Sequence, residues 1–328
     1  MGVAGGYLAA RLSDEHQVVG FDRLGREEFD AVCAWGTSKD AISRILRAAG
    51  LNFDDYVMHD GRLMRVDIGH EVVDIKLRGL CCFDKLGLVR ELGENVPIRF
   101  GRNVSRLPQD EEYDLVLDAT GLARPLLPRI SEDTLIPCLQ YKVKFPEPPF
   151  DDFYIKPFSG LSGYFWYFPL ENGYAHVGAG DLQKRHLSEL GTFMHRYGGE
   201  IVKKVGRPVR ISPPNMCEPF FEGKVIGVGE SIGTVYPLLG EGIIPSLQCA
   251  EFLAQNLEDR ETYRRRVLGK FQVYHSVYQF IMAKIRGRFS LVSQFPNLLK
   301  VFLHMRANER RYGMEIHLAD FLKVIRSV

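Results

Sequence analysis

The first residues of the chain carry a glycine pattern that could bind a diphosphate. Gly2, Ala4 and Gly5 open an apolar helix start, and a short strand over 16–22 ends in the carboxylate of Asp22. Glycines let a diphosphate approach a helix N-terminus, and an acid about 20 residues further on can accept hydrogen bonds from ribose hydroxyls. The motif's first glycine and the strand before it would fall ahead of Met1. This half-motif predicts a nucleotide-binding domain whose first strand is missing.

A second pattern consists of aromatic residues that alternate with period two. Tyr164, Trp166 and Phe168 therefore share one face of a predicted strand. A turn at 171–173 leads into a return strand over 174–180, whose closing Gly-Ala-Gly allows close approach to the backbone. The pattern is compatible with two structures. One is a hairpin with an aromatic face in an ordinary core, and the other is an aromatic wall that lines an apolar ligand pocket.

Several other segments are predicted to place small residues around the same nucleotide site. Residues 112–118 form a predicted buried strand that ends in the turn 118–121, with further strands expected at 96–100 and 103–107. A strand over 223–230 ends at Glu230 and leads through the glycine-rich loop 236–243 into a helix over 244–256. Such a turn offers free backbone N–H groups and the positive end of a helix dipole. The loop therefore either binds an anionic or electron-rich edge of a ligand or serves only as a cap of the helix.

Composition limits the classes of protein to consider. The 328 residues suffice for one large or two ordinary domains, and 45% hydrophobic with 25% charged residues is typical of soluble proteins. The sequence contains no run of about 18 apolar residues, so we expect no membrane-spanning helix. It opens with no basic-then-apolar leader, so we expect no secretory signal. The six cysteines lack paired C-x-x-C spacing, so we expect no metal site, no disulfide framework and a cytoplasmic location.

The segment 260–328 differs from the rest in charge. It holds fourteen Lys and Arg against four Asp and Glu, although the whole chain carries only +1. Large apolar residues recur in it, which predicts amphipathic helices broken near Gly287 and Pro296. The segment is either a helical cap with a solvated cationic face or a surface that contacts the anionic inner face of a membrane. We expect no nucleic-acid partner, because recognised binding motifs are absent.

The spacing Y-x-W-x-F-P, followed after eight residues by G-x-G, closely resembles the substrate-pocket signature of the geranylgeranyl reductase family of flavoproteins. The order of the other segments is similar to the FAD-binding fold that this family shares with flavin hydroxylases. The resemblance implies an α/β FAD-binding domain over 1–130 and 217–258. It also implies an antiparallel-sheet substrate domain over 131–216 and a basic helical segment over 259–328.

The resemblance also implies roles for individual residues. The cofactor-binding positions, which would hold FAD, are Gly2, Ala4, Gly5, Asp22, Cys33, Ala34, Gly36, Val104, Asp118, Gly121, Glu230, Pro237, Gly240, Gly242 and Ile243. The substrate-binding positions are Tyr164, Trp166, Phe168, Pro169, Gly178 and Gly180. Cys33 is the first candidate for a catalytic proton donor, with a buried structural cysteine as the alternative.

The implied activity is FAD-dependent saturation of C=C bonds in geranylgeranyl chains, of archaeal-type ether lipid precursors or of geranylgeranyl diphosphate. The electron donor would be a ferredoxin-like protein or a reduced nicotinamide. An FAD-dependent monooxygenase of the aromatic hydroxylase type and a flavin-free remnant of the family are the alternatives. The sequence contains no second dinucleotide motif, no G-x-S-x-G element and no metal-ligand helix, so it does not suggest other chemistry.

Overall fold

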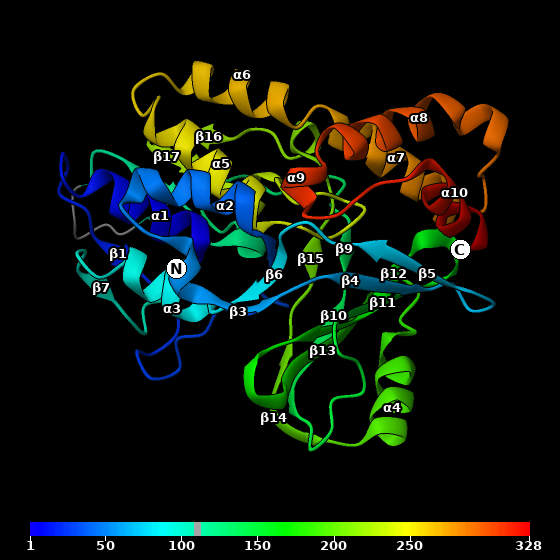
Figure 1. The fold of residues 1–328 in the computed structure, drawn as a ribbon. Helices are drawn as coiled ribbons and strands as arrows, with labels where there is room; N and C mark the ends of the chain where they lie inside the picture. The colour runs from blue at the N-terminus through cyan, green and yellow to red at the C-terminus, as the bar shows by residue number, and fades with distance from the viewer. Residues whose placement is uncertain (108–112) are drawn as a thin grey trace.

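The computed structural model describes residues 1–107 and 113–328, and it has mixed α/β architecture (Figure 1). A large sheet runs through the centre, with a group of helices and short strands at one end and the C-terminal helices over the other (Figure 1). The helices in the described residues are α1 (Val3–Leu12), α2 (Lys39–Leu46), α3 (Lys85–Leu92), α4 (His186–Tyr197), α5 (Ile243–Ala254), α6 (Arg260–Lys270), α7 (Val273–Ile285), α8 (Leu291–Ala307), α9 (Glu309–Tyr312) and α10 (Leu318–Ser327).

The large sheet has seven strands in the order β14-β10-β13-β12-β11-β4-β5. Neighbouring strands are antiparallel except for β11 and β4, which run parallel. Five of the strands come from the predicted substrate domain, and β4 and β5 come from the range 1–130. The strands are β14 (Glu200–Gly206), β10 (Cys138–Lys144), β13 (Tyr174–Asp181), β12 (Gly163–Pro169), β11 (Phe153–Pro157), β4 (Leu63–Asp67) and β5 (Val72–Lys76).

The two faces of this sheet have different surroundings. Alternate residues of β12, including Phe165 and Tyr167, join a small apolar core with Phe193 of α4. The opposite face carries Tyr164, Trp166 and Phe168, as the period-two pattern predicted, and all three side chains line a cavity. The register is set by the hairpin 171–173, which connects β12 directly to β13.

Shorter sheets make up the remaining strand structure. β1 and β7 run parallel, as do β8 and β17, and α1 packs against α3 and α5 beside them. β16 pairs antiparallel with β17, and a three-stranded sheet β2-β6-β3 and a pair β15-β9 complete the described strands. The bounds are β1 (Gly20–Phe21), β2 (Gly36–Ser38), β3 (Val57–Asp60), β6 (Leu80–Phe83), β7 (Ile98–Arg99), β8 (Val116–Asp118), β9 (Leu135–Ile136), β15 (Val209–Arg210), β16 (Phe221–Glu222) and β17 (Val225–Gly227).

Two predictions of local structure are wrong. Residues 103–107 form no strand, because their backbone runs as an irregular segment along the cavity, where Val104 and Ser105 are lining residues. Pro296 does not break a helix, since it lies inside α8. A proline there costs one backbone hydrogen bond of the helix without ending it. The predicted break near Gly287 is confirmed, because Gly287 lies between α7 and α8 and has a φ of +63°. The predicted strand beginning at residue 112 reaches into 108–112, outside the described residues.

Candidate functional site

A single cavity connects the predicted nucleotide site with the aromatic face of the large sheet. Its volume is about 1810 Å³, well above the roughly 300–1000 Å³ of pockets for small ligands. The lining extends from the N-terminus of α1, across the face of β12, to side chains of α10. A cavity of this size and length can hold an elongated ligand, or two ligands end to end.

At one end, the cavity meets the N-terminus of α1. Gly2 is the N-cap residue, and its backbone is extended with no side-chain cap, so the first N–H groups of the helix are not capped by a side chain there. A Cβ at Gly5 would lie 3.1 Å from Cβ of Ala119, which shows how closely α1 approaches the turn after β8. Asp22 lies just after β1 and accepts a hydrogen bond from the backbone N–H of Leu24 at 2.9 Å. Its other carboxylate oxygen contacts the amino group of Met1.

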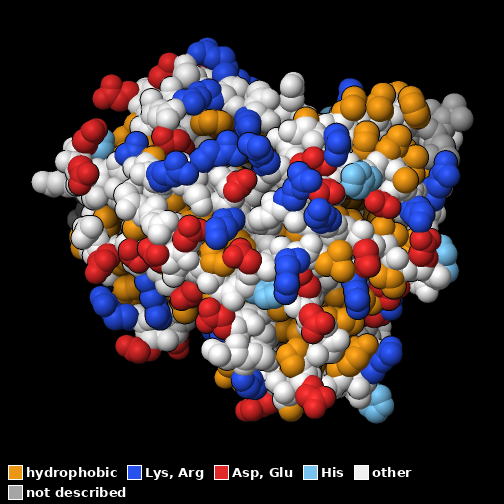
Figure 2. All heavy atoms as spheres, viewed as in Figure 1, with side chains coloured by type: hydrophobic (Ala, Val, Ile, Leu, Met, Phe, Trp, Pro, Cys, Tyr) orange, Lys and Arg blue, Asp and Glu red, His pale blue; other side chains and the backbone are white. Residues whose placement is uncertain are grey.

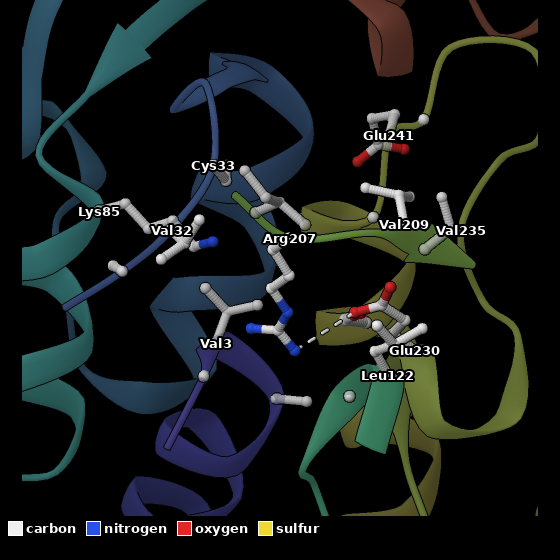
Figure 3. Close-up of a pocket in the computed structure, with 18 of the residues that line it drawn as sticks. Val3, Val32, Cys33, Lys85, Leu122, Arg207, Val209, Glu230, Val235 and Glu241 are labelled. Carbon is white, nitrogen blue, oxygen red and sulfur yellow. Dashed lines mark ion pairs between the residues drawn. The ribbon is translucent and has the colours of Figure 1, made fainter. Parts of the chain in front are cut away.

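An arginine that the sequence did not point to crosses the middle of the cavity. Arg207 extends between Val3 of α1 and Glu230, and its guanidinium lies 3.8 Å from the Glu230 carboxylate (Figure 3). The turn at Gly121 lies directly beneath, since a Cβ there would approach Nη2 of Arg207 to 2.8 Å. Glu230 also accepts a hydrogen bond from the backbone N–H of Arg210 at 3.1 Å. The site therefore places a cation and an anion next to the turn after β8.

The loop that leads into α5 forms another wall of the cavity. Gly240 has a φ of +60°, which favours glycine, and Glu241 accepts a hydrogen bond from the N–H of Ile244 at 2.9 Å. The second oxygen of Glu241 pairs with the buried guanidinium of Arg311 on α9 at 2.9 Å. Burial raises the pKa of the Glu241 carboxyl, and the charge of Arg311 opposes that shift. Arg311 also donates to the Tyr274 hydroxyl of α7 at 2.7 Å, so α9 and α7 hold this loop from behind.

Aromatic rings cover the floor of the cavity along β12. Tyr164 donates its hydroxyl hydrogen bond to the carbonyl of Leu239 in the loop before α5. Its ring centroid lies 5.7 Å from that of Trp166, edge to face. The indole of Trp166 lies over the neighbouring strand, because a Cβ at Gly178 would come within 2.2 Å of Cζ2. Phe168 similarly occupies the space that a side chain at Gly36 would need.

Cys33 lies in the segment that faces this floor. Its thiol sulfur accepts a hydrogen bond from the N–H of Trp35 at 3.2 Å, and its carbonyl accepts one from Nε2 of Gln140 at 3.0 Å. The neighbouring ring of His176 is buried, and desolvation lowers its pKa to about 4, so this imidazole is neutral near pH 7. Burial also raises the pKa of the Cys138 thiol to about 12, which keeps it protonated.

The structure brings most of the predicted site residues to this one cavity. The lining residues among the predicted set are Gly2, Ala4, Gly5, Asp22, Cys33, Ala34, Gly36, Val104, Gly121, Tyr164, Trp166, Phe168, Gly180, Glu230, Pro237, Gly240, Gly242 and Ile243.

Three predicted residues do not line it. Asp118 is fully buried, and its carboxylate accepts hydrogen bonds from the Thr120 hydroxyl at 2.6 Å and the Leu126 N–H at 3.2 Å. It therefore holds the turn after β8 in shape. Pro169 ends β12, and Gly178 lies beneath the Trp166 ring.

Sequence reasoning missed Lys85, Gln140, Arg207 and Arg311, which all line the cavity. Arg311 was counted only as one charge of the basic segment, although it is buried against Glu241, 70 residues earlier. Gln140 lies in β10 and Arg207 in the connection between β14 and β15, and neither is part of a sequence motif. Only the three-dimensional pairing identifies them.

Comparisons with known proteins find relatives in sequence and in fold. No protein-family profile matches the chain. Digeranylgeranylglycerophospholipid reductase 2 of Methanothermobacter thermautotrophicus is 30% identical over 176 residues, which are 50% of this chain and 45% of the relative. The solved structure of a geranylgeranyl bacteriochlorophyll reductase-like protein from Thermoplasma acidophilum superimposes with a TM-score of 0.73 at 14% identity. That match covers 99% of this chain and 93% of the other.

The resemblance to the geranylgeranyl reductase family is confirmed. PqsL of Pseudomonas aeruginosa, a probable FAD-dependent monooxygenase, shares the fold with a TM-score of 0.63 at 17% identity, over 90% of this chain and 97% of the other. These solved structures share the α/β fold of this chain. The chain spans less than half the length of its curated geranylgeranyl reductase relative.

Proposed function

We propose that the protein is an FAD-dependent reductase that saturates C=C bonds of geranylgeranyl chains. The observation that carries this proposal is the continuity of the cavity, which runs from the N-terminus of α1 to the aromatic floor of β12. A dinucleotide bound at the first end would lay its ring system toward the second. The aromatic floor and the α10 side chains Phe321 and Val324 provide an apolar path for a long hydrocarbon.

The residues present fit FAD. The N-terminus of α1 and the cation of Arg207 would receive the diphosphate. Asp22 would accept hydrogen bonds from the adenosine ribose, and Glu230 from the ribityl hydroxyls. The loop at Gly240 would follow the pyrimidine edge of the ring system. When bound, FAD supplies hydride chemistry that no side chain can perform.

The protein's own contribution to the reaction is positional. Tyr164, Trp166 and Phe168 would hold the hydrocarbon flat and keep bulk water away from the reacting carbons. The proton for the second carbon would come from a group on the opposite wall. Cys33 is the side chain that we would test first there.

We further propose a peripheral contact with an anionic membrane through the C-terminal helices. On α8, Phe295, Leu299 and Leu303 are 57%, 41% and 53% exposed and follow one another at four-residue spacing. Apolar side chains gather over this part of the surface (Figure 2). α10, whose Phe321 packs against Phe302 of α8, contributes lining residues to the cavity. A hydrocarbon substrate dissolved in a bilayer would have a short path from this surface. No helix in the described parts of the chain is long and apolar enough to traverse a bilayer.

The test begins with colour and cofactor content. The purified protein should bind FAD, either as isolated or after incubation with it. With a chemical reductant and no oxygen, it should add two hydrogens per double bond to a geranylgeranyl lipid, as seen by mass spectrometry. Product formed only in the presence of oxygen would instead assign a monooxygenase. A protein that takes up no FAD would refute the cofactor and the reaction together.

A further inference from the structure

Gln140 and Trp166 belong to one row of side chains across the cavity face of the large sheet. Gly178 of β13 pairs with Gln140 of β10 on one side and with Trp166 of β12 on the other. Directly opposed residues point to the same face, so both side chains flank a position that has none. Both residues line the cavity.

The orientation of the Gln140 amide is fixed by its partner. Its Nε2 lies 3.0 Å from the carbonyl oxygen of Cys33, which can only accept a hydrogen bond. The amide nitrogen must therefore face Cys33, which leaves Oε1 as the free end. Gln140 is 7% exposed, and this oxygen is buried with no hydrogen bond to any described residue.

Trp166 presents the complementary group in the same row. Its Nε1 would lie 2.8 Å from a Cβ at Gly178, so the N–H edge of the indole sits above the strand that separates it from Gln140. Trp166 is 9% exposed, and among the described residues its N–H also has no acceptor. The protein thus buries one unmatched donor and one unmatched acceptor on two strands that flank β13, and the indole N–H edge reaches over β13 toward Gln140.

Such a pair is costly unless something occupies the space between its members. A buried polar group without a partner has given up its hydrogen bonds to water and gained none in return. The other tryptophan shows the usual solution, since Nε1 of Trp35 donates to the carbonyl of Ala31 at 2.7 Å. Gln140 and Trp166 do not bond to each other, and because Gly178 has no side chain, the indole can lie over β13 toward Gln140.

We propose that this row is a binding site for one hydroxyl oxygen. The oxygen accepts the N–H of Trp166 and donates its own hydrogen to Oε1 of Gln140. A water molecule and the hydroxyl end of an alcohol share this chemistry, and both fit a site with two polar partners that otherwise opens to an apolar cavity. This proposal deepens the proposed function. Binding of an alcohol hydroxyl rests on that function, whereas binding of water does not. It would fix which part of a long chain stops on the aromatic floor.

The chain's two tryptophans allow a direct test by NMR. In deuterated, ¹⁵N-labelled protein the indole N–H groups give two signals, and Trp166→Phe identifies one of them. We expect the Trp166 signal to show cross-relaxation with a long-lived water and the Trp35 signal to show none. Gln140→Leu should remove that water contact and shift only the Trp166 signal. Gln183→Leu, at an exposed position, should change neither.

A second arm separates the two sources of the oxygen. Geranylgeraniol and a saturated hydrocarbon of equal length are added to the same sample. If water is absent and only the alcohol shifts the Trp166 signal, the ligand supplies the hydroxyl. Gln140→Leu should then weaken alcohol binding about tenfold relative to the hydrocarbon.

The proposal fails if the Trp166 indole contacts no water and responds equally to alcohol and hydrocarbon. It also fails if Gln140→Leu leaves the Trp166 signal unchanged. Neither arm needs flavin or turnover. A protein that binds no FAD but shows the Gln140-dependent signal would overturn the proposed reductase function and leave this site standing.

Discussion

Gly178 determines how the aromatic floor lies. A methyl group at this position would approach Cζ2 of Trp166 to 2.2 Å, so Gly178→Ala must push the indole off β13. We expect prenyl-lipid reduction to fall at least about tenfold, at a cost in stability of roughly 1–3 kcal/mol, while FAD content stays unchanged. Activity assays and flavin absorbance on the same samples check both statements.

Gly191→Ala is the matched control for that substitution. This glycine lies within α4, where a Cβ would meet no atom within 4 Å. Alanine there should be neutral or stabilise the helix by roughly 0.5–1 kcal/mol, with no effect on activity. Loss of flavin together with activity in Gly178→Ala would mean that Trp166 supports the cofactor site instead of the substrate.

His176 makes stability depend on pH on the acid side. Desolvation lowers the pKa of its folded-state imidazole to about 4, whereas the unfolded chain protonates near 6.5. The unfolded state therefore binds more protons in this range, and stability falls as the pH drops from about 6.5 to about 4. The full effect is on the order of 3 kcal/mol, and burial shifts the pKa of His304 in the same direction.

In His176→Gln, the free energy of unfolding should fall about half as much between pH 6.5 and 4, because the protonation of His304 still contributes to the fall. Urea unfolding at pH 7.5, 6.5, 6 and 5 provides the measurement. An unchanged slope between pH 6.5 and 5 would show that His176 does not remain neutral in the folded protein.

At the scale of elements, the buried pair of Glu241 and Arg311 ties the loop before α5 to α9. Arg311→Met would leave a buried carboxylate without its cation, which typically costs about 3–5 kcal/mol. Adding Glu241→Gln should recover much of that loss, because the unpaired charge is then gone. A double-mutant cycle in urea isolates the coupling. A loss below about 1 kcal/mol in Arg311→Met alone would show that the pair is not a structural tie.

The sequence predicted the elements whose signal is local. The hairpin around 171–173 and the helix predicted over 244–256 follow from turn residues and periodicity, and both are found, the helix as α5 (Ile243–Ala254). β4 and β5 are not among the predicted elements. Their membership in the large sheet depends on the pairing of Ile155 with Val66, and nothing near either residue encodes that pairing.

The site shows the same division between local and long-range information. The three motif rings and most of the motif glycines line the cavity, whereas Gly178 lies beneath the Trp166 ring. The partners that orient them come from far along the chain: Gln140 reaches Cys33, and Arg311 reaches Glu241. Asp118 was assigned to the cofactor because its motif is shared, yet its carboxylate is used to hold the adjacent turn. A motif identifies candidate residues, but only the folded structure shows which of their side chains face the ligand site.

At the scale of the whole molecule, two surfaces of the C-terminal segment can be distinguished. Arg264 of α6 is paired with Glu218 at 2.5 Å, and Arg266 stacks on Phe252 of α5. These arginines are engaged within the protein, whereas the apolar stripe on α8 is exposed. The stripe is therefore the better candidate for membrane contact.

Flotation with anionic vesicles tests this assignment. Replacing Phe295, Leu299 and Leu303 with Gln should weaken binding roughly tenfold or more, because each loses apolar area that a bilayer would bury. The matched control replaces Arg264, Arg265 and Arg266 with Gln and should bind nearly as well as the natural protein. The reverse order of effects would assign the contact to α6. Binding that ignores salt and lipid charge would show that basic residues contribute nothing to it.

The two-sided character of β12 also matters for how the protein can change over evolutionary time. Trp166 and Tyr167 are neighbours in the chain, yet one faces the ligand space and the other faces the core beneath α4. Substitutions at every second position could therefore reshape what the cavity accepts without disturbing the packing that keeps the sheet folded. A strand built in this way allows binding preferences to diverge among relatives while the scaffold stays constant.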